Sequence, residues 1–181
     1  MNKKSELTTY RLVLKNIEDK DKASMIKMVN DPKIKKTYML PDLENEEQET
    51  KLFNKLKDLT NAKEHIVYGI YLNDRLIGFI NDVNVTPETV EVGYFIDSDE
   101  WNKGYATEAL WVYMKQLFEM GFFNVEAAYF EGNDASMKVM KKCGMHPSGK
   151  QEIINYRGQN LTAIYYQINK RQFLVVYQEN N

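Results

Sequence analysis

The alternation of apolar and polar positions divides the chain into helix-like and strand-like segments. Helical spacing of apolar residues predicts four helices. They span Glu18–Asn30, Asn45–Thr60, Lys103–Met120 and Asn133–Cys143. Short runs rich in β-branched and aromatic residues predict the strands. They are Thr9–Leu14, His65–Leu72, Arg75–Val85, Thr89–Ile96 and Asn124–Phe130, with two further strands within residues 146–170. This order of segments predicts a mixed α/β domain with a mainly antiparallel sheet.

Turn signals separate several of these segments. Asn73-Asp74 and Thr86-Pro87-Glu88 join three strands into a predicted antiparallel meander, and Arg157-Gly158 joins the last two strands. Gly121 and Gly144 follow the third and fourth helices, where glycine commonly ends a helix. The helix that precedes Gly121 connects two strands, so this part of the chain is expected to form a strand, helix, strand unit.

Two segments carry no clear period. Lys33–Glu44, KIKKTYMLPDLE, is expected to be a basic and aromatic loop. The tail 171–181, RQFLVVYQENN, is expected either to extend the last strand or to cover an edge of the sheet. No internal repeat or linker-like composition is evident, so residues 1–181 are expected to form a single domain.

The composition is that of a globular protein. The 181 residues are 43% hydrophobic and 28% charged, without a low-complexity tract. The formal net charge of -2 argues against a protein that neutralises nucleic-acid phosphates. No signal-peptide pattern or apolar run of membrane-spanning length is present, so we expect a cytoplasmic protein that binds neither nucleic acid nor membrane.

Few residues suited to metal or redox chemistry occur. Cys143 is the single cysteine, which excludes a disulfide framework, and its apolar neighbours favour a core position over a nucleophile. His65 and His146 lie far apart and have no cysteine companions. We therefore expect no metal site.

A short glycine-containing loop precedes the third helix. The first turn of a helix offers backbone N–H groups that suit phosphates. Small residues at Gly104 and Ala106 would let an anion approach the backbone, while Lys103 adds a charge and Thr107 a hydroxyl. The pattern is neither a P-loop nor a dinucleotide fingerprint. Equally, Gly104 could simply allow a tight entry into a helix.

In that purely structural alternative, the helix would be capped by Ser98, Asp99 or Asn102.

Three motifs together resemble the GNAT superfamily of acyl-CoA-dependent N-acetyltransferases. They are VEVGYFI, WNKGYATEAL and, about 25 residues later, EGNDASMKVMKKCGM. The closest likeness is to the branch of ribosomal-protein-alanine N-terminal acetyltransferases, and it covers nearly the whole chain. It implies a central, mainly antiparallel sheet of about seven strands with four main helices. The sheet would be splayed between its fourth and fifth strands.

The resemblance also implies a site for acetyl-CoA. The family's pyrophosphate loop falls on Trp101–Ala106, with Thr107 next, and Trp101 departs from the usual Gln or Arg. The implied contacts are Asn102, Lys103, Gly104, Tyr105, Ala106 and Thr107. Backbone groups of Tyr94, Phe95 and Ile96 would pair with the pantetheine arm, and one N–H would face the thioester oxygen.

Asn133 and Ser136 match a second coenzyme element of the family. The resemblance implies that they contact the pantetheine and the sulfur. Alternatively, Asn133 caps the helix and Ser136 bonds locally. Many relatives place a proton-donating tyrosine seven residues after the asparagine, but Met140 occupies that position here. The proton for the coenzyme thiolate is therefore expected from Ser136 or water.

An amine acceptor is protonated at neutral pH, so its acetylation needs a base. Our candidate is Glu91, which shares a strand face with Gly93 and Phe95. A solvent-facing or ion-paired glutamate is the alternative. The basic residues of the fourth helix are expected to be solvated, although one of them could reach the adenosine phosphate. They are Lys138, Lys141 and Lys142.

The predicted activity is direct transfer of acetyl from acetyl-CoA to a primary amine, without a metal or an acyl-enzyme. The acceptor would be a small molecule or a protein N-terminus, and the protein a monomer or homodimer. A non-catalytic acyl-CoA-binding or regulatory module is the alternative, suggested by Met140. Fold alone does not identify the acceptor.

Overall fold

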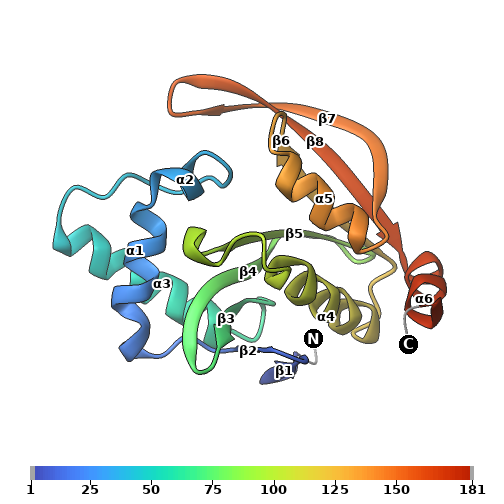
Figure 1. Cartoon of the computed structure of the whole chain (residues 1–181), viewed down its shortest axis with the longest axis horizontal. Helices are drawn as coiled ribbons and strands as arrows, with labels where there is room; N and C mark the ends of the chain where they lie inside the picture. The colour runs from blue at the N-terminus through green and yellow to red at the C-terminus, as the bar shows by residue number, and fades with distance from the viewer. Residues whose placement is uncertain (1–2, 180–181) are drawn as a thin grey trace. The chain divides into compact units, whose positions relative to one another are not determined.

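The computed structural model describes residues 3–179, which form a mixed α/β fold (Figure 1). Its strands are β1 (Glu6–Thr8), β2 (Leu12–Lys15), β3 (Tyr68–Leu72), β4 (Arg75–Val85), β5 (Thr89–Ile96), β6 (Asn124–Phe130), β7 (His146–Tyr156) and β8 (Gln159–Asn169). Its helices are α1 (Lys22–Asn30), α2 (Pro32–Lys35), α3 (Glu46–Asn61), α4 (Tyr105–Glu119), α5 (Asp134–Lys142) and α6 (Lys170–Glu179). Two 3-10 turns, η1 (Asp19–Asp21) and η2 (Ser98–Glu100), precede α1 and follow β5.

The eight strands found within residues 3–179 follow the order β1-β2-β3-β4-β5-β6-β8-β7. β5 and β6 run parallel, because α4 connects them, whereas β1–β2, β2–β3, β3–β4, β6–β8 and β7–β8 are antiparallel. The mixed, mainly antiparallel sheet confirms the predicted fold class.

The chain divides into two compact units that share β4, β5 and α4. The first runs to Asn81 and includes Tyr94–Tyr113, and the second contains Asp82–Gly93 and the chain from Met114 onward. Each unit buries apolar side chains of its own. The expectation of a single domain over residues 1–181 stays a prediction.

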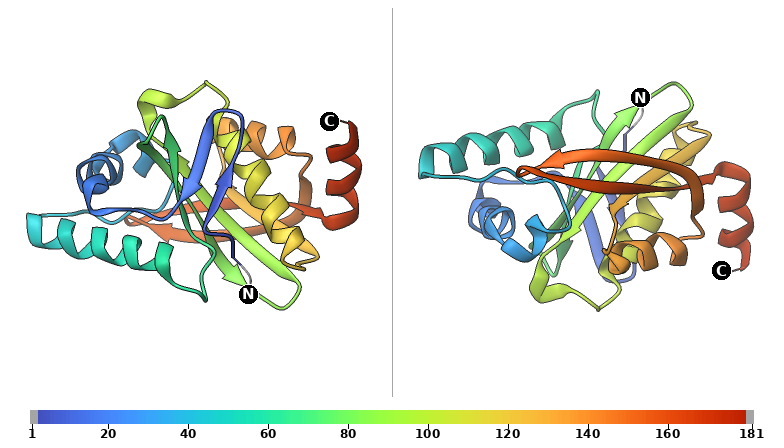
Figure 2. Two further views of the ribbon diagram at one scale, coloured as in Figure 1. Left: turned by 90° about the horizontal axis from the view of Figure 1, so that it is seen from below. Right: turned by 90° about the horizontal axis from the view of Figure 1, so that it is seen from above.

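The first unit has a core between helices and strands. In Figure 2, α1 and α3 lie next to each other, and both contribute to this core. The buried members are Ile17, Met25, Met28, Val29, Ile34, Leu40, Phe53, Val67, Tyr71, Leu76, Phe79 and Phe95. The helical spacing of α1 and the strand alternation of β3–β5 place these side chains on the faces that meet.

In the second unit β6 pairs with β5 on one side and β8 on the other. The parallel ladder has four register pairs, from Thr89↔Asn124 to Val92↔Ala127, although β5 continues to Ile96 and β6 to Phe130. The β7–β8 hairpin turns at Arg157 and Gly158, whose φ values of 53° and 72° are left-handed. Such values at both central residues are those of a type I′ turn, and the turn lies where the sequence predicted one.

The other turn signals are also confirmed. Asn73 and Asp74 have φ values of 49° and 62° between β3 and β4, and Gly121 and Gly144 have φ values of 103° and 80° after α4 and α5. No helix within residues 3–179 has both the length and the apolarity needed to cross a bilayer.

At the N-terminus the predicted strand Thr9–Leu14 is wrong in its first half. Thr9–Arg11 form a turn between β1 and β2. The Thr9 N–H donates to the Leu12 carbonyl at 2.9 Å, and the Thr9 hydroxyl oxygen accepts the Leu12 N–H at 2.9 Å. A threonine side chain that satisfies the backbone locally competes with the ladder, which explains why the strand starts only at Leu12.

Two further segments differ from the expectation. Pro32–Lys35, whose last three residues were expected to open the loop, form α2, because Asp31 accepts the Lys33 N–H at 2.7 Å as a cap and Pro32 occupies the first turn. The tail does not extend β8. It forms α6, where Phe173 is buried and packs against Phe118 with ring centroids 5.0 Å apart. Residues 180–181 of that tail lie outside the described residues.

Candidate functional site

The loop between β5 and α4 belongs to the first unit. Asn102 and Gly104 both have left-handed φ values, 61° and 84°. α4 starts at Tyr105, and the Glu108 N–H donates to the Gly104 carbonyl at 3.1 Å. The N–H groups of Tyr105 and Ala106 lie in the first turn, where a helix offers no carbonyl four residues earlier, which makes this junction a backbone site suited to an anion.

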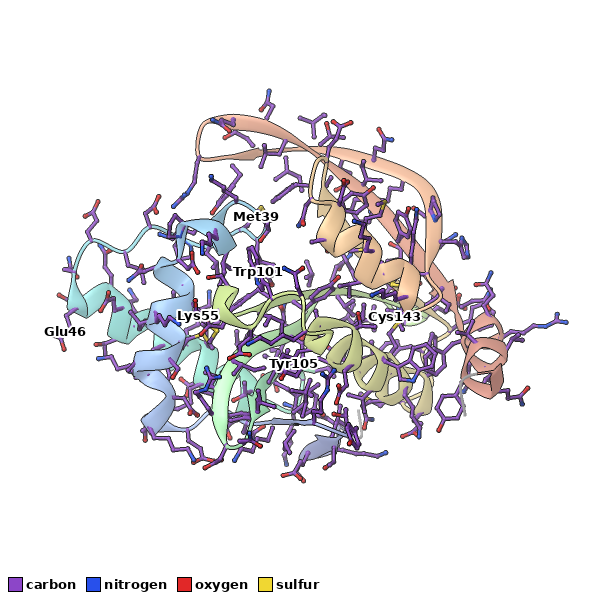
Figure 3. All side chains as sticks on the ribbon, viewed as in Figure 1. Met39, Glu46, Lys55, Trp101, Tyr105 and Cys143 are labelled. Carbon is purple, nitrogen blue, oxygen red and sulfur yellow. The ribbon has the colours of Figure 1, made fainter. Side chains whose placement is uncertain are left out.

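Two of the three caps considered for a purely structural glycine, Ser98 and Asp99, do not lie at the start of α4. Ser98 and Asp99 lie one turn earlier, in η2, where Asp97 accepts the Asp99 N–H at 3.1 Å. Gly104 directly precedes the first helical residue, Tyr105. In Figure 3, Trp101 and Tyr105 mark the two ends of the exposed loop.

An acidic turn, DSDE (residues 97–100), precedes the loop, and basic side chains of the same unit neutralise its carboxylates. Lys27 Nζ lies 3.0 Å from Asp97 and 2.5 Å from Asp99, and its hydrogen bond lowers the pKa of Asp99. Glu100 lies 2.8 Å from Lys103 Nζ and 2.5 Å from Arg75 Nη2, and these contacts lower its pKa. The acidic residues therefore do not oppose an anion at the neighbouring backbone with their full charge.

These contacts revise the role expected of one side chain. The Lys103 ammonium donates to Glu100 and, at 3.1 Å, to the Asp99 carbonyl. Its charge is thus engaged within the loop, so the backbone of Lys103, and not its ammonium, is the part suited to an anion. Trp101 has a similar bracing role, since its indole N–H donates to the Ile96 carbonyl at 2.8 Å.

The end of β5 is held rigidly next to the loop. Phe95 is buried between Phe79, whose ring stacks on it at 5.8 Å, and Tyr38, whose edge meets it at 5.2 Å. A Cβ added at Gly78 would lie 2.6 Å from the Phe95 carbonyl, so only glycine lets β4 come this close. Tyr94–Ile96 thus present backbone from a fixed strand.

Glu91 lies in the second unit, on β5 opposite Glu126 of β6. Burial raises the pKa of Glu91. Lys150 opposes this shift, and the carboxylates of Glu152 and Glu126 add to it. Lys150 Nζ is 3.0 Å from Glu152, which also accepts a hydrogen bond from the Tyr165 hydroxyl at 2.8 Å. A half-buried carboxylate near other carboxylates is a better proton acceptor than an exposed one, as a general base requires.

Asn133 and Ser136 are adjacent at the start of α5, also in the second unit. The Asn133 side-chain oxygen accepts the Ser136 N–H at 3.3 Å, so the capping alternative for Asn133 is confirmed. Ser136 is partly exposed, whereas Met140 and Cys143 are completely buried. Burial raises the pKa of Cys143 to about 12, which suits a core thiol and not a nucleophile.

Two groups of predicted residues emerge from this placement. The first unit holds Tyr94–Ile96 and Asn102–Thr107, and the second holds Glu91, Asn133 and Ser136. Among residues 3–179, no group of three or more histidine, cysteine, aspartate or glutamate side chains is arranged to hold a metal ion.

The sequence did not reveal Arg11, which the structure places against the loop. Its side chain donates to the Lys103 carbonyl at 2.9 Å and to Glu108 at 2.7 Å. The two partners are 92 and 97 residues away in sequence, so no local pattern could pair them. A usable signal was Glu108 itself, because a carboxylate so close to an anion site would repel the anion unless a cation offset its charge.

Comparisons with known proteins agree with this fold and these motifs. The profile of the family described as "Acetyltransferase (GNAT) domain" matches residues 11–146. "Uncharacterized protein YkkB" of Bacillus subtilis (strain 168) is 31% identical over 160 residues, which cover 82% of this chain and 89% of that protein.

Solved structures show the same architecture. The crystal structure of an acetyltransferase (GNAT family) from Bacillus anthracis superposes with a TM-score of 0.78 at 25% identity, covering 92% of this chain and 99% of the other. RimL, described as a ribosomal L7/L12 alpha-N-protein acetyltransferase in complex with coenzyme A, superposes with a TM-score of 0.79 at 14% identity, covering 91% and 97%. Because the family profile spans most of the chain, and a relative more than 30% identical covers four fifths of it, this protein belongs to the GNAT family of acetyltransferases.

Proposed function

We propose that this protein uses acetyl-CoA to acetylate a primary amine directly. The observation that carries the proposal is the loop from Asn102 to Thr107, where two left-handed residues lead into the first turn of α4. Diphosphates suit such a junction because several amides converge on one anion. The coenzyme A in the RimL structure and the GNAT family profile support the same ligand for this chain.

In the proposed complex the backbone does most of the binding. The amides of Asn102, Lys103, Gly104, Tyr105 and Ala106, with Thr107, hold the pyrophosphate. Tyr94–Ile96 pair with the pantetheine as an added strand would, and one of their N–H groups stabilises the oxyanion of the transition state. Asn133 and Ser136 contact the pantetheine and the sulfur. Acetyl-CoA supplies an activated acyl group when it is bound.

The side chains of the second unit supply the proton chemistry. Glu91 takes the proton from the protonated acceptor amine, directly or through water. The neutral amine then attacks the thioester carbonyl, a C–N bond forms, the C–S bond breaks, and the nitrogen gives up its remaining extra proton, which restores the one supplied to the thiolate. The leaving thiolate takes its proton from Ser136 or water, because the buried Met140 side chain cannot donate one.

The acceptor is proposed at the level of its reacting group. RimL is named an alpha-N-protein acetyltransferase, which favours a protein N-terminus, and small primary amines undergo the same chemistry. Because the fold does not select among acceptors, both classes belong in the test. We propose a single cytoplasmic domain that acts as a monomer or a homodimer.

The test is acceptor-dependent release of free thiol from acetyl-CoA. Purified protein would be assayed with ribosomal-protein N-terminal peptides, polyamines, amino acids and aminoglycosides, and mass spectrometry would verify a gain of one acetyl group on the amine. Thiol release with at least one acceptor is expected. Tight binding of acetyl-CoA with no turnover across the panel would favour a non-catalytic module, and absence of coenzyme binding would refute the proposal altogether.

A further inference from the structure

Arg11 lies in the turn between β1 and β2, yet its contacts are with the start of α4. Its backbone N–H donates to Glu108 Oε1 at 2.8 Å, and its Nε donates to Glu108 Oε2 at 2.7 Å. Its Nη1 donates to the Lys103 carbonyl at 2.9 Å, and its guanidinium carbon lies 4.6 Å from the centre of the Tyr105 ring. The guanidinium thereby contacts the last loop residues through Lys103 and the first turn of α4 through Tyr105 and Glu108.

The Glu108 carboxylate is ionised and accepts hydrogen bonds from both Thr9 and Arg11. Burial alone would raise the pKa of Glu108, but hydrogen bonds from Thr9 and Arg11 lower it overall. Glu108 therefore remains charged at neutral pH and pairs with Arg11 in the bidentate manner that arginine favours. Nε and Nη2 face Glu108 and Nη1 faces Lys103, so at least three of the five N–H donors of the guanidinium point to groups of the protein itself.

The contact with the Lys103 carbonyl fixes the orientation of one peptide group. In a planar trans peptide the C=O and the following N–H point in opposite directions. Since Arg11 holds the Lys103 carbonyl, the Gly104 N–H must point away from Arg11. Gly104 has a φ of 84°, but glycine adopts positive and negative φ about equally well, so the backbone alone would let this peptide flip.

From this geometry we propose that Arg11 is a positioning residue, which with Glu108 holds the Lys103–Gly104 peptide so that the Gly104 amide faces the coenzyme pyrophosphate. The inference rests on the proposed function, because it assigns a role within the proposed pyrophosphate loop. It predicts that the Arg11–Glu108 pair supports binding of the pyrophosphate half of the coenzyme and does not affect the reaction at the thioester.

The experiment compares two acyl donors. Acetyl-CoA carries the pyrophosphate, whereas S-acetyl-pantetheine lacks it. In Arg11→Ala the KM for acetyl-CoA should rise about tenfold, the effect of one charge-assisted hydrogen bond. Turnover at saturating acetyl-CoA and kcat/KM for S-acetyl-pantetheine should stay within about twofold of wild type, since neither depends on the loop amides. In Arg11→Lys the KM for acetyl-CoA should lie between the values for wild type and Arg11→Ala, because one ammonium cannot hold both Glu108 and the Lys103 carbonyl.

A matched control separates positioning from general stability. Lys57→Ala removes another ion pair between distant segments of the same unit, Lys57 Nζ to Asp19 at 2.5 Å, and should change neither donor. If Arg11→Ala fails to fold, Arg11→Lys and Glu108→Gln carry the test with the same selective readout. Equal losses with both donors, or an unchanged KM for acetyl-CoA, would overturn the role of Arg11. A wild-type protein that binds no coenzyme would refute the proposed function instead.

Discussion

The loop Asn102–Thr107 and the strand face around Glu91 differ in how their carboxylates are surrounded. Next to the loop, the carboxylates of the DSDE turn contact Lys27, Arg75 and Lys103, so their charges are neutralised in place. Around Glu91, Glu126 and Glu152 raise its pKa while Lys150 opposes them, and burial dominates the balance. One region has its charges cancelled, and the other retains a carboxylate with a perturbed pKa.

This difference suggests a division of labour. A backbone site needs its amides correctly oriented and tolerates many side chains, provided that glycine stands where φ is positive. A side chain that accepts a proton needs a perturbed pKa and tolerates little chemical change. Substitutions should therefore affect coenzyme affinity in the loop and proton transfer on the strand, with little crossover between the two.

The largest effect is expected for Glu91→Gln. Removal of a general base should lower kcat about 10²- to 10⁴-fold, while acetyl-CoA affinity measured by calorimetry stays unchanged. Because burial raises the pKa of Glu91, the stability of the folded state falls as the pH rises from the ordinary glutamate pKa to the raised one and stays lower above it, so the variant should melt no lower than wild type at pH 8. Unchanged turnover across the pH range would remove Glu91 as the base.

The next effect, at Gly104, should appear in affinity. Gly104→Val places a β-branched residue at a φ of 84°, with its Cβ 3.4 Å from Arg11 Nη2. The strain should cost about 1–2 kcal/mol, either as lower stability or as a reoriented peptide that weakens coenzyme binding about tenfold. Calorimetric titration and thermal melts measure both. Wild-type values in both would contradict a backbone anion site at this position.

A smaller effect should appear in the pH profile of Lys150→Met. Lys150 lowers the pKa of Glu91, so its removal should raise that pKa further and move the acidic limb of kcat/KM to higher pH, by up to about one unit. Glu152→Gln removes a carboxylate that raises the pKa, and should move the limb to lower pH. Shifts of the same sign in both variants would exclude Glu91 as the group that controls this limb.

The smallest effect should come from Lys103→Met. The Lys103 ammonium is already paired with Glu100, so its loss should raise the Kd for CoA by less than about threefold, the scale of an exposed ion pair. Binding measured at low and high salt would test this directly. A loss of tenfold or more, abolished by salt, would mean that Lys103 contacts a phosphate and that the loop does not act through its backbone alone.

Local signals predicted much of the fold because they depend on neighbouring residues alone. Asn73-Asp74 and Arg157-Gly158 adopt left-handed conformations that few residue types accept, and both turns were located correctly. The tail was harder to predict. Its run of leucine and valines is compatible with a strand, but burial of Phe173 against Phe118 coincides with a helical segment, α6. Tertiary packing overrides weak local preference in such segments.

The sequence by itself determined the motif that places a glycine at the entrance to α4, the alternation that puts Glu91 on a strand, and the family to which these motifs point. Only the tertiary structure decided how the charges are shared. Arg11 pairs with Glu108 and Lys27 with the DSDE turn, while Glu91 lies near the carboxylates of Glu126 and Glu152, and each of these interactions joins residues from different elements. Coulomb interactions depend on distance and burial, which folding sets and linear order does not.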